Sequence, residues 1–150
     1  MDAAEYPIEA VRELILNALI HRDYSIHTQG MPIQLQILDD RMTIINPGSL
    51  YGRLTIDQLG TIQPDTRNPV IANALEVLRV TKNRYSGIPT VRRLASETGM
   101  AAPLFENTRG EFRATLYSPL ARTTLPSVMS HEAFNRLDYQ ANGQRPNSRR

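Results

Sequence analysis

The sequence contains no cysteine and no tryptophan, and aromatic residues make up only 6% of its 150 residues. Without cysteine, a disulfide scaffold and metal sites built on thiolates are excluded. No apolar run approaches the roughly 18 residues that a membrane-spanning helix needs, and the N-terminus lacks the pattern of an export signal. We therefore expect a cytoplasmic location and no membrane partner. A hydrophobic content of 41% still suffices for one domain with a core.

Positive charge is scarce in the body of the chain, defined as residues 1–117. The body holds 12 lysines and arginines against 13 acidic residues, a balance of −1. Residues 118–150 hold 5 arginines against 2 acidic residues, a balance of +3. Because the body has no basic patch of the kind that binds a phosphate backbone, any DNA contact is expected from this basic tail or from an absent domain.

The first strong pattern is a predicted helix over residues 8–22. Its apolar residues follow one stripe that should face the core, and Pro7 suits the first turn. The stripe consists of Ile8, Val11, Leu14, Ile15, Ala18 and Leu19. Glu13, Asn17 and His21 are four residues apart, so they share a neighbouring ridge. A carboxylate, a carboxamide and an imidazole in a row indicate a site. The alternative is that Asn17 is a polar residue at the edge of the core.

Alternating residues predict a hairpin, with strands over 33–38 and 42–45 and a turn at 39–41. Asn46-Pro47-Gly48 is a turn signal that ends it. The remaining predictions are a loop over 49–67 with a short helical turn at 55–59 capped by Thr55, a helix over 70–78 after the cap Asn68, a turn at 82–87, a helix over 88–98, a loop at 101–103, a strand over 111–117, and a mobile tail from 118 with a short helix at 131–139.

Three common motifs can be excluded. His21-Arg22-Asp23 resembles a kinase catalytic loop, but the position of the required asparagine holds Thr28. A P-loop sequence is absent, which excludes a P-loop ATPase or helicase motor on this chain. The three histidines lack metal-ligand spacing.

Several short segments occur in an order that is informative as a set. They are ALIHRDYS at 18–25, DDR at 39–41, INPG at 45–48, RNP at 67–69 and SGI at 86–88. This ordered set resembles the GHKL (Bergerat-fold) ATP-binding domains, and more narrowly the RecG C-terminal-like members found behind a Schlafen/AlbA-like domain in prokaryotic proteins thought to regulate transcription. The resemblance covers about residues 6–117. It implies an α+β fold, a two-layer α/β sandwich with helices on one face of a mixed or antiparallel sheet.

The resemblance also implies a site for ATP and Mg²⁺. Asn17 matches the asparagine whose side-chain oxygen coordinates Mg²⁺, and Glu13 matches the base that acts on water in hydrolytic members. His21 and Arg22 would reach the phosphates or a lid formed by residues 49–68. The remaining expected contacts are Asn46 and Gly48 with adenine, Ser86 and Gly87 with phosphate at a helix start, and Arg67 with phosphate.

Two positions depart from the family pattern. Asn46 stands where the family has aspartate, and Tyr85 stands where it has the first glycine of a pair. Such a domain could bind nucleotide weakly, hydrolyse it slowly, or keep only the fold. The expected function is therefore an ATP-binding regulatory domain over residues 6–117 followed by a flexible basic tail over 118–150. The alternative is a non-catalytic module for assembly or DNA-associated regulation, and a homo-oligomer remains open.

Overall fold

The computed structural model describes residues 4–63, 65–80 and 87–120. Its helices and strands are α1 (Ile8–His21), β1 (Gln34–Ile37), β2 (Arg41–Pro47), α2 (Pro69–Val77), α3 (Gly87–Glu97), β3 (Leu104–Thr108) and β4 (Glu111–Tyr117), with 3₁₀ turns η1 (Ile26–Thr28) and η2 (Ile56–Gln58). The predicted turn at 82–87 lies outside the described residues except for Gly87. The tail beyond 120, with its short helix at 131–139, lies outside them too.

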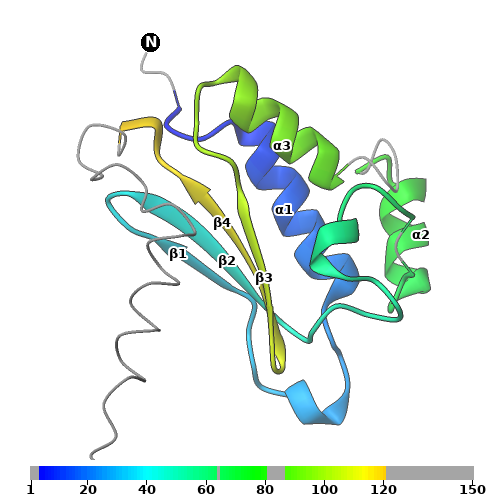
Figure 1. Ribbon diagram of the computed structural model, residues 1–150. Helices are drawn as coiled ribbons and strands as arrows, with labels where there is room; N and C mark the ends of the chain where they lie inside the picture. The colour runs from blue at the N-terminus through cyan, green and yellow to red at the C-terminus, as the bar shows by residue number, and fades with distance from the viewer. Residues whose placement is uncertain (1–3, 64, 81–86, 121–150) are drawn as a thin grey trace, which may run out of the picture.

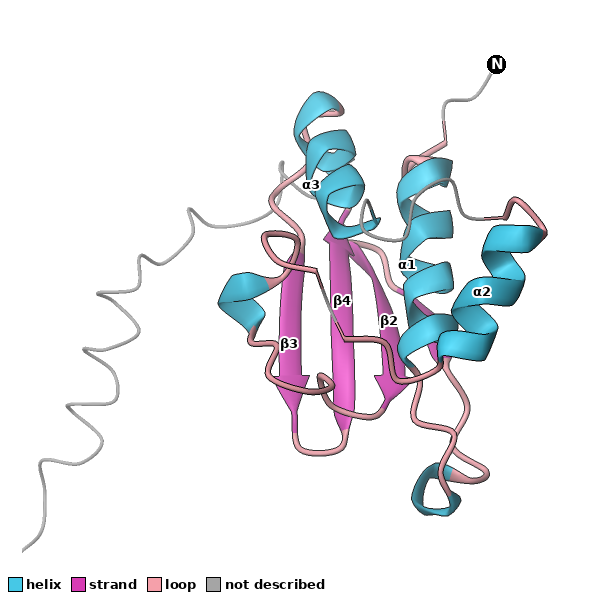
Figure 2. Ribbon diagram, turned by 90° about the vertical axis from the view of Figure 1, so that its right-hand side faces the viewer, coloured by secondary structure: helices cyan, strands magenta, loops and turns pink. Residues whose placement is uncertain are grey.

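The described strands form one antiparallel sheet in the order β1-β2-β4-β3. Figure 1 shows α1 and α3 side by side on one face of this sheet. Helix α2 packs beside α1 on the side opposite α3 (Figure 2), and it lies farther from the sheet than α1 does (Figure 1). The predicted α+β fold is confirmed. None of the described helices is both long and apolar enough to cross a bilayer.

The core lies between the two helices and the sheet. Three buried residues of α1, Ala10, Leu14 and Ala18, recur every fourth position. They pack with Val91 and Ala95 of α3 in a single cluster. The alanines let the helix axes approach closely, since they leave little side chain between them. The sheet closes the cluster from below with Met42, Ile44, Phe105, Ala114 and Leu116.

The predicted apolar stripe of the first helix is partly wrong. Ile8, Ile15 and Leu19 are 74%, 41% and 37% exposed, whereas Ala10 is 1% exposed. The apolar residues of α1 span more than one face, and α3 packs on the face with the smallest side chains. Judged by hydrophobicity alone, Ile8 and Ile15 are better candidates for burial than Ala10. The sequence therefore predicted a core-facing side that included Ile8 and Ile15 and omitted Ala10.

The sheet differs from the prediction in two places. Strand β3 was not predicted: only Phe105 in it is buried, and it exists because it pairs with β4 across a turn at Gly110 with φ +94°. Strand β2 continues through Asn46 and Pro47, where a turn was expected. Asn46 pairs with Phe112 of β4 and is 3% exposed. It alternates along β2 with the core residues Met42 and Ile44, so its side chain lies on the same, helix-covered face.

The predicted cap of α2 has another partner. Asn68 precedes the helix as expected, but its side chain makes no capping bond there. Its Nδ2 donates instead to the carbonyls of Ile20 and Arg22, at 2.8 and 2.7 Å. These carbonyls lie at the C-terminal end of α1, where backbone acceptors lack helical partners. Asn68 therefore ties the end of segment 49–68 to α1.

Candidate functional site

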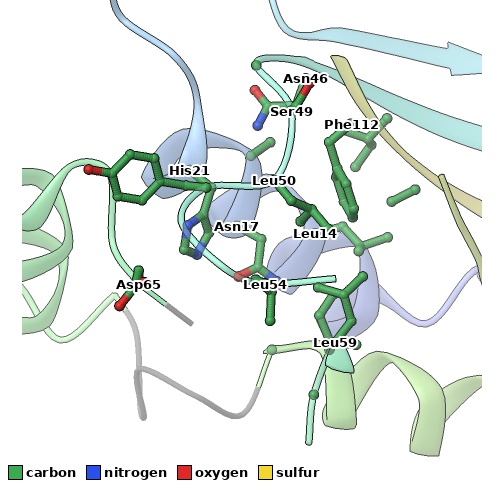
Figure 3. Close-up of a pocket in the computed structure, with 18 of the residues that line it drawn as sticks. Leu14, Asn17, His21, Asn46, Ser49, Leu50, Leu54, Leu59, Asp65 and Phe112 are labelled. Atoms are coloured by element: carbon green, nitrogen blue, oxygen red, sulfur yellow. The ribbon is translucent and has the colours of Figure 1, made fainter. Parts of the chain in front are cut away.

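A pocket lies where α1, the end of β2, segment 49–65 and the start of α3 meet (Figure 3). Nine residues were predicted for the site from the sequence. Five of them line the pocket: Asn17, His21, Asn46, Gly48 and Gly87. The other lining residues are mostly apolar, and they include Leu14, Ile44, Leu50, Leu54, Leu59, Ile88, Phe112 and Ala114.

Asn17 and Gly87 meet at one end of the pocket. A Cβ at Gly87 would stand 2.6 Å from Asn17 Nδ2 and 3.2 Å from Oδ1, so any larger residue there would force this amide to move. Asn17 Nδ2 is buried and has no hydrogen-bond partner among the described residues. A buried donor left unpaired costs about 1–3 kcal/mol. An unpaired polar group that lines a cavity is a candidate ligand contact.

Asn46 supplies a second unpaired group at the sheet side of the pocket. The residue is 3% exposed, and its Oδ1 is buried without a partner among the described residues. Phe112 lies opposite on β4 and also lines the pocket. The pocket therefore combines an apolar wall with two amides whose hydrogen-bonding capacity is unused. This combination is typical of a small-molecule site.

Segment 49–65 covers the pocket with apolar side chains. Leu50 and Leu54 reach into the hollow in Figure 3, and Leu59 is 6% exposed beneath them. The cavity that remains measures about 90 Å³, well below the roughly 300–1,000 Å³ typical of ligand pockets. A nucleotide would therefore fit only after this segment moves outward.

His21 lines the pocket one helical turn after Asn17. Burial lowers the pKa of His21 below its usual 6.5, and the nearby Arg67 guanidinium lowers it further. The imidazole is therefore neutral at pH 7, with one nitrogen donating and one accepting. The described lining contains no lysine or arginine, and Asp65 is its one carboxylate.

At Gly48 the end of β2 comes close to the backbone of Asp23. Its φ is +107°, and a Cβ there would stand 2.7 Å from the Asp23 Cβ. The Asp23 amide donates to Pro47 O at 2.9 Å, and the Gly48 amide donates to Gly110 O at 2.8 Å. The glycine thus lets the chain after α1 pack against the end of β2, which places Asn46 beside α1.

Two predicted arginines are bonded to other groups and are not among the lining residues. Arg67 Nη1 lies 3.4 Å from Asp23 Oδ2, and its Nη2 donates to Ser49 O at 3.0 Å. The Arg67 guanidinium also lies over the Tyr51 ring, 4.9 Å from its centroid. Arg22 Nη1 donates to Asp23 O at 3.1 Å, and its Nη2 donates to Met31 O. Neither arginine is part of the lining.

The last two predicted residues are not in the described lining either. Glu13 is half-buried on α1, one turn before Asn17, and Ser86 lies outside the described residues. The sequence reasoning also missed lining residues, notably Phe112 and the leucines of segment 49–65. The apolar residues at 50, 54, 56, 59 and 62 could have indicated that this segment packs on the core rather than forming a polar loop.

The comparisons with known proteins agree with this fold. A family described as "Putative ATP-dependent DNA helicase recG C-terminal" matches residues 30–116, a narrower span than the 6–117 expected. A Corynebacterium diphtheriae protein, whose crystal structure comes from a structural genomics programme, is 26% identical with a TM-score of 0.69. That alignment covers 76% of this chain and 24% of the other.

The chain thus spans about a quarter of the solved relative's length. No curated protein matches the sequence. The family match covers more than half of the chain, although it begins after α1 and so leaves out Asn17 and His21. We conclude that the chain belongs to the RecG C-terminal family of ATPase-like domains.

Proposed function

We propose that residues 6–117 form a GHKL-type domain that binds ATP in the pocket between α1, β2 and α3. The observation that carries this proposal is a pair of amides, Asn17 and Asn46, which line one cavity and each have a buried atom without a hydrogen-bond partner among the described residues. Asn46 Oδ1 can accept from an exocyclic amine of a base held against Phe112. Asn17 then lies toward the phosphates. Membership of an ATPase-like family supports nucleotide as the ligand.

Magnesium fits the phosphate end of this pocket. The described residues include no group of three or more histidines, cysteines or acids that could hold a metal. Mg²⁺ often takes only one or two protein oxygens and the rest from phosphates and water. The Asn17 side-chain oxygen can be one of these, and Mg²⁺ would offset phosphate charge that no arginine or lysine of the lining meets. The backbone N–H groups that begin α3 at Gly87 favour negative charge as well.

Glu13 is the proposed base for hydrolysis. It is half-buried on α1 one turn before Asn17, outside the described lining. A base must come within hydrogen-bond reach of the attacking water, directly or through another water. We expect slow hydrolysis, because Glu13 does not reach the pocket in this arrangement. Phosphate release should therefore fall to background in Glu13→Gln while ATP affinity changes less than about threefold.

Calorimetric titration with Mg-ATP tests the proposal. We expect binding at micromolar to millimolar nucleotide, and a loss of at least about tenfold in Asn17→Ala, close to 1.4 kcal/mol. Omission of Mg²⁺ should weaken ATP binding by the wild-type protein more than ATP binding by Asn17→Ala. Asn73→Ala, an exposed amide of α2, is the matched control. A folded wild-type sample that shows no heat at millimolar Mg-ATP refutes the proposal.

We further propose that the domain serves a larger regulator. From the resemblance, we expect a Schlafen/AlbA-like domain to precede it in the full protein. Because the body has a net charge of −1, we expect DNA to contact that domain or the basic tail. A gel shift compares the full chain with residues 1–117, checked for folding by circular dichroism. Salt-sensitive DNA binding by residues 1–117 would contradict the charge argument.

A second candidate function is a non-catalytic module that keeps the fold for assembly or DNA-associated regulation. The small cavity beneath Leu50 and Leu54 favours it, since the pocket is largely filled. In that case the apolar cover should stay closed. Leu54→Ser should then lower stability without creating any affinity for Mg-ATP, whereas under the first proposal it should ease opening and tighten binding.

A further inference from the structure

The polar groups around Asn46 are already paired with one another. Ser49 Oγ donates to Thr108 O at 2.9 Å and accepts from the Gly110 amide at 3.1 Å. The Gly48 amide donates to Gly110 O. The Asn46 side chain is therefore the polar group left to recognise the edge of a planar ligand on this side of the pocket, within the described part of the chain.

No hydrogen bond among the described residues determines which way the Asn46 amide faces. Its Oδ1 is buried without a partner. An amide carries an acceptor on one arm and donors on the other, and the two arms exchange by a half-turn with little change of shape. A carboxylate in the same place would be able only to accept. The pocket edge can thus accept from an amine or donate to a carbonyl.

We infer that this pocket takes 6-oxopurine nucleotides as well as 6-aminopurine nucleotides, with Asn46 as the residue that determines base tolerance. This inference depends on the proposed nucleotide function. Asn46 accepts from the 6-amino group of ATP through Oδ1, and after the half-turn it donates to the 6-oxygen of ITP or GTP through Nδ2. The apolar wall of Ile44, Phe112 and Ala114 contacts either ring system alike, because it presents no polar atom that would distinguish them.

Calorimetric titrations of the full chain with Mg-ATP and Mg-ITP test this inference. ITP is the cleaner probe because, unlike GTP, it adds no 2-amino group. We expect the two dissociation constants to agree within about tenfold, since neither leaves the amide unpaired. A site built on a group that cannot switch rejects the wrong partner by roughly 10⁴-fold or more. Preference for ATP over ITP by more than about 100-fold in wild type overturns the inference and leaves nucleotide binding intact.

Asn46→Asp provides the matched perturbation. The carboxylate accepts the 6-amino group but repels the 6-oxygen, so the ITP-to-ATP ratio of dissociation constants should rise at least about 30-fold. The ratio cancels any general repulsion of phosphate by the new charge. Gln36→Glu, which adds the same charge on the exposed strand β1, should leave the ratio unchanged. An unchanged ratio in folded Asn46→Asp also overturns the inference.

Failure of the two proposals can be told apart. If neither ATP nor ITP binds to the folded chain, the nucleotide function fails and the inference fails with it. If ATP binds and ITP does not, only the inference fails. The wild-type comparison decides the matter even where Asn46→Asp does not fold.

Discussion

Gly87→Ala is the most informative single change, because it adds one methyl group against the Asn17 amide. The new Cβ would stand 2.6 Å from Asn17 Nδ2, whereas ordinary contacts begin at 3.4 Å. The amide must therefore retreat by about 0.8 Å, the difference of these two distances. Gly87 lacks the positive φ of glycines such as Gly48 and Gly110, so alanine meets no backbone strain there.

Two opposing effects determine the change in stability. Overpacking a tight site costs roughly 1–3 kcal/mol, while replacing glycine by alanine in a helix gains up to about 1 kcal/mol. We expect a net loss of about 0–2 kcal/mol in the free energy of unfolding. Mg-ATP affinity should fall by about tenfold or more, because the Asn17 amide, whose oxygen is the proposed metal ligand, has to move away from its place beside Gly87.

A double-mutant cycle with Asn17→Ala isolates the contact. Asn17→Ala alone should cost little, since it removes a buried donor without a partner and improves helix propensity. With the amide gone, the new Cβ loses its three nearest neighbours, and Gly87→Ala should stabilise by about 0.5–1 kcal/mol.

The coupling energy from thermal and urea unfolding should therefore be about 1–3 kcal/mol. Ser96→Ala, at an exposed position of α3, controls for general helix effects. If the two substitutions prove additive within about 0.5 kcal/mol, the packing argument is refuted, along with the claim that glycine is required beside Asn17.

Three further predictions concern contacts around the pocket. Asn68→Ala removes two hydrogen bonds to the end of α1 and should cost about 1–2 kcal/mol in urea unfolding; Asn68→Asp, which cannot donate, should fare no better. Arg67→Lys keeps the charge near Asp23 but loses the planar contacts with Ser49 O and Tyr51, so limited proteolysis within segment 49–65 should speed up several-fold relative to wild type, and equal rates would contradict this. The pKa of His21 is lowered in the folded state, so the unfolded chain binds more protons as pH falls through 6.5 and stability should decrease there. In His21→Gln the melting temperature should depend less on pH between pH 7 and 5 than in the wild type. An unchanged pH dependence would show that another group titrates.

The sequence determined the elements with strong local patterns. Helices α1 and α3, the β1–β2 hairpin and strand β4 follow from apolar periodicity and from the residues that end each element, such as Gly99 after α3. The ordered segments also indicated the family. Each segment alone is a weak match to the family pattern, but all of them occur in the order that the family has. Local patterns thus sufficed for these elements and for two of the lining residues, Asn17 and His21. The resemblance to the family supplied the fold class and the other three, Asn46, Gly48 and Gly87.

Tertiary contacts decided the rest. Strand β3 has too little apolar alternation to be recognised and exists through its ladder with β4. Asn68 bonds to a helix 46 and 48 residues away rather than to its own.

The pocket itself depends on such distant contacts. The end of β2 approaches Asp23, two residues after α1, only because Gly48 has no Cβ. Segment 49–65 closes over Asn17 and Asn46 because its leucines pack against the core. A sequence shows which side chains can pair, but which of them lose their partners on burial depends on how the distant segments pack.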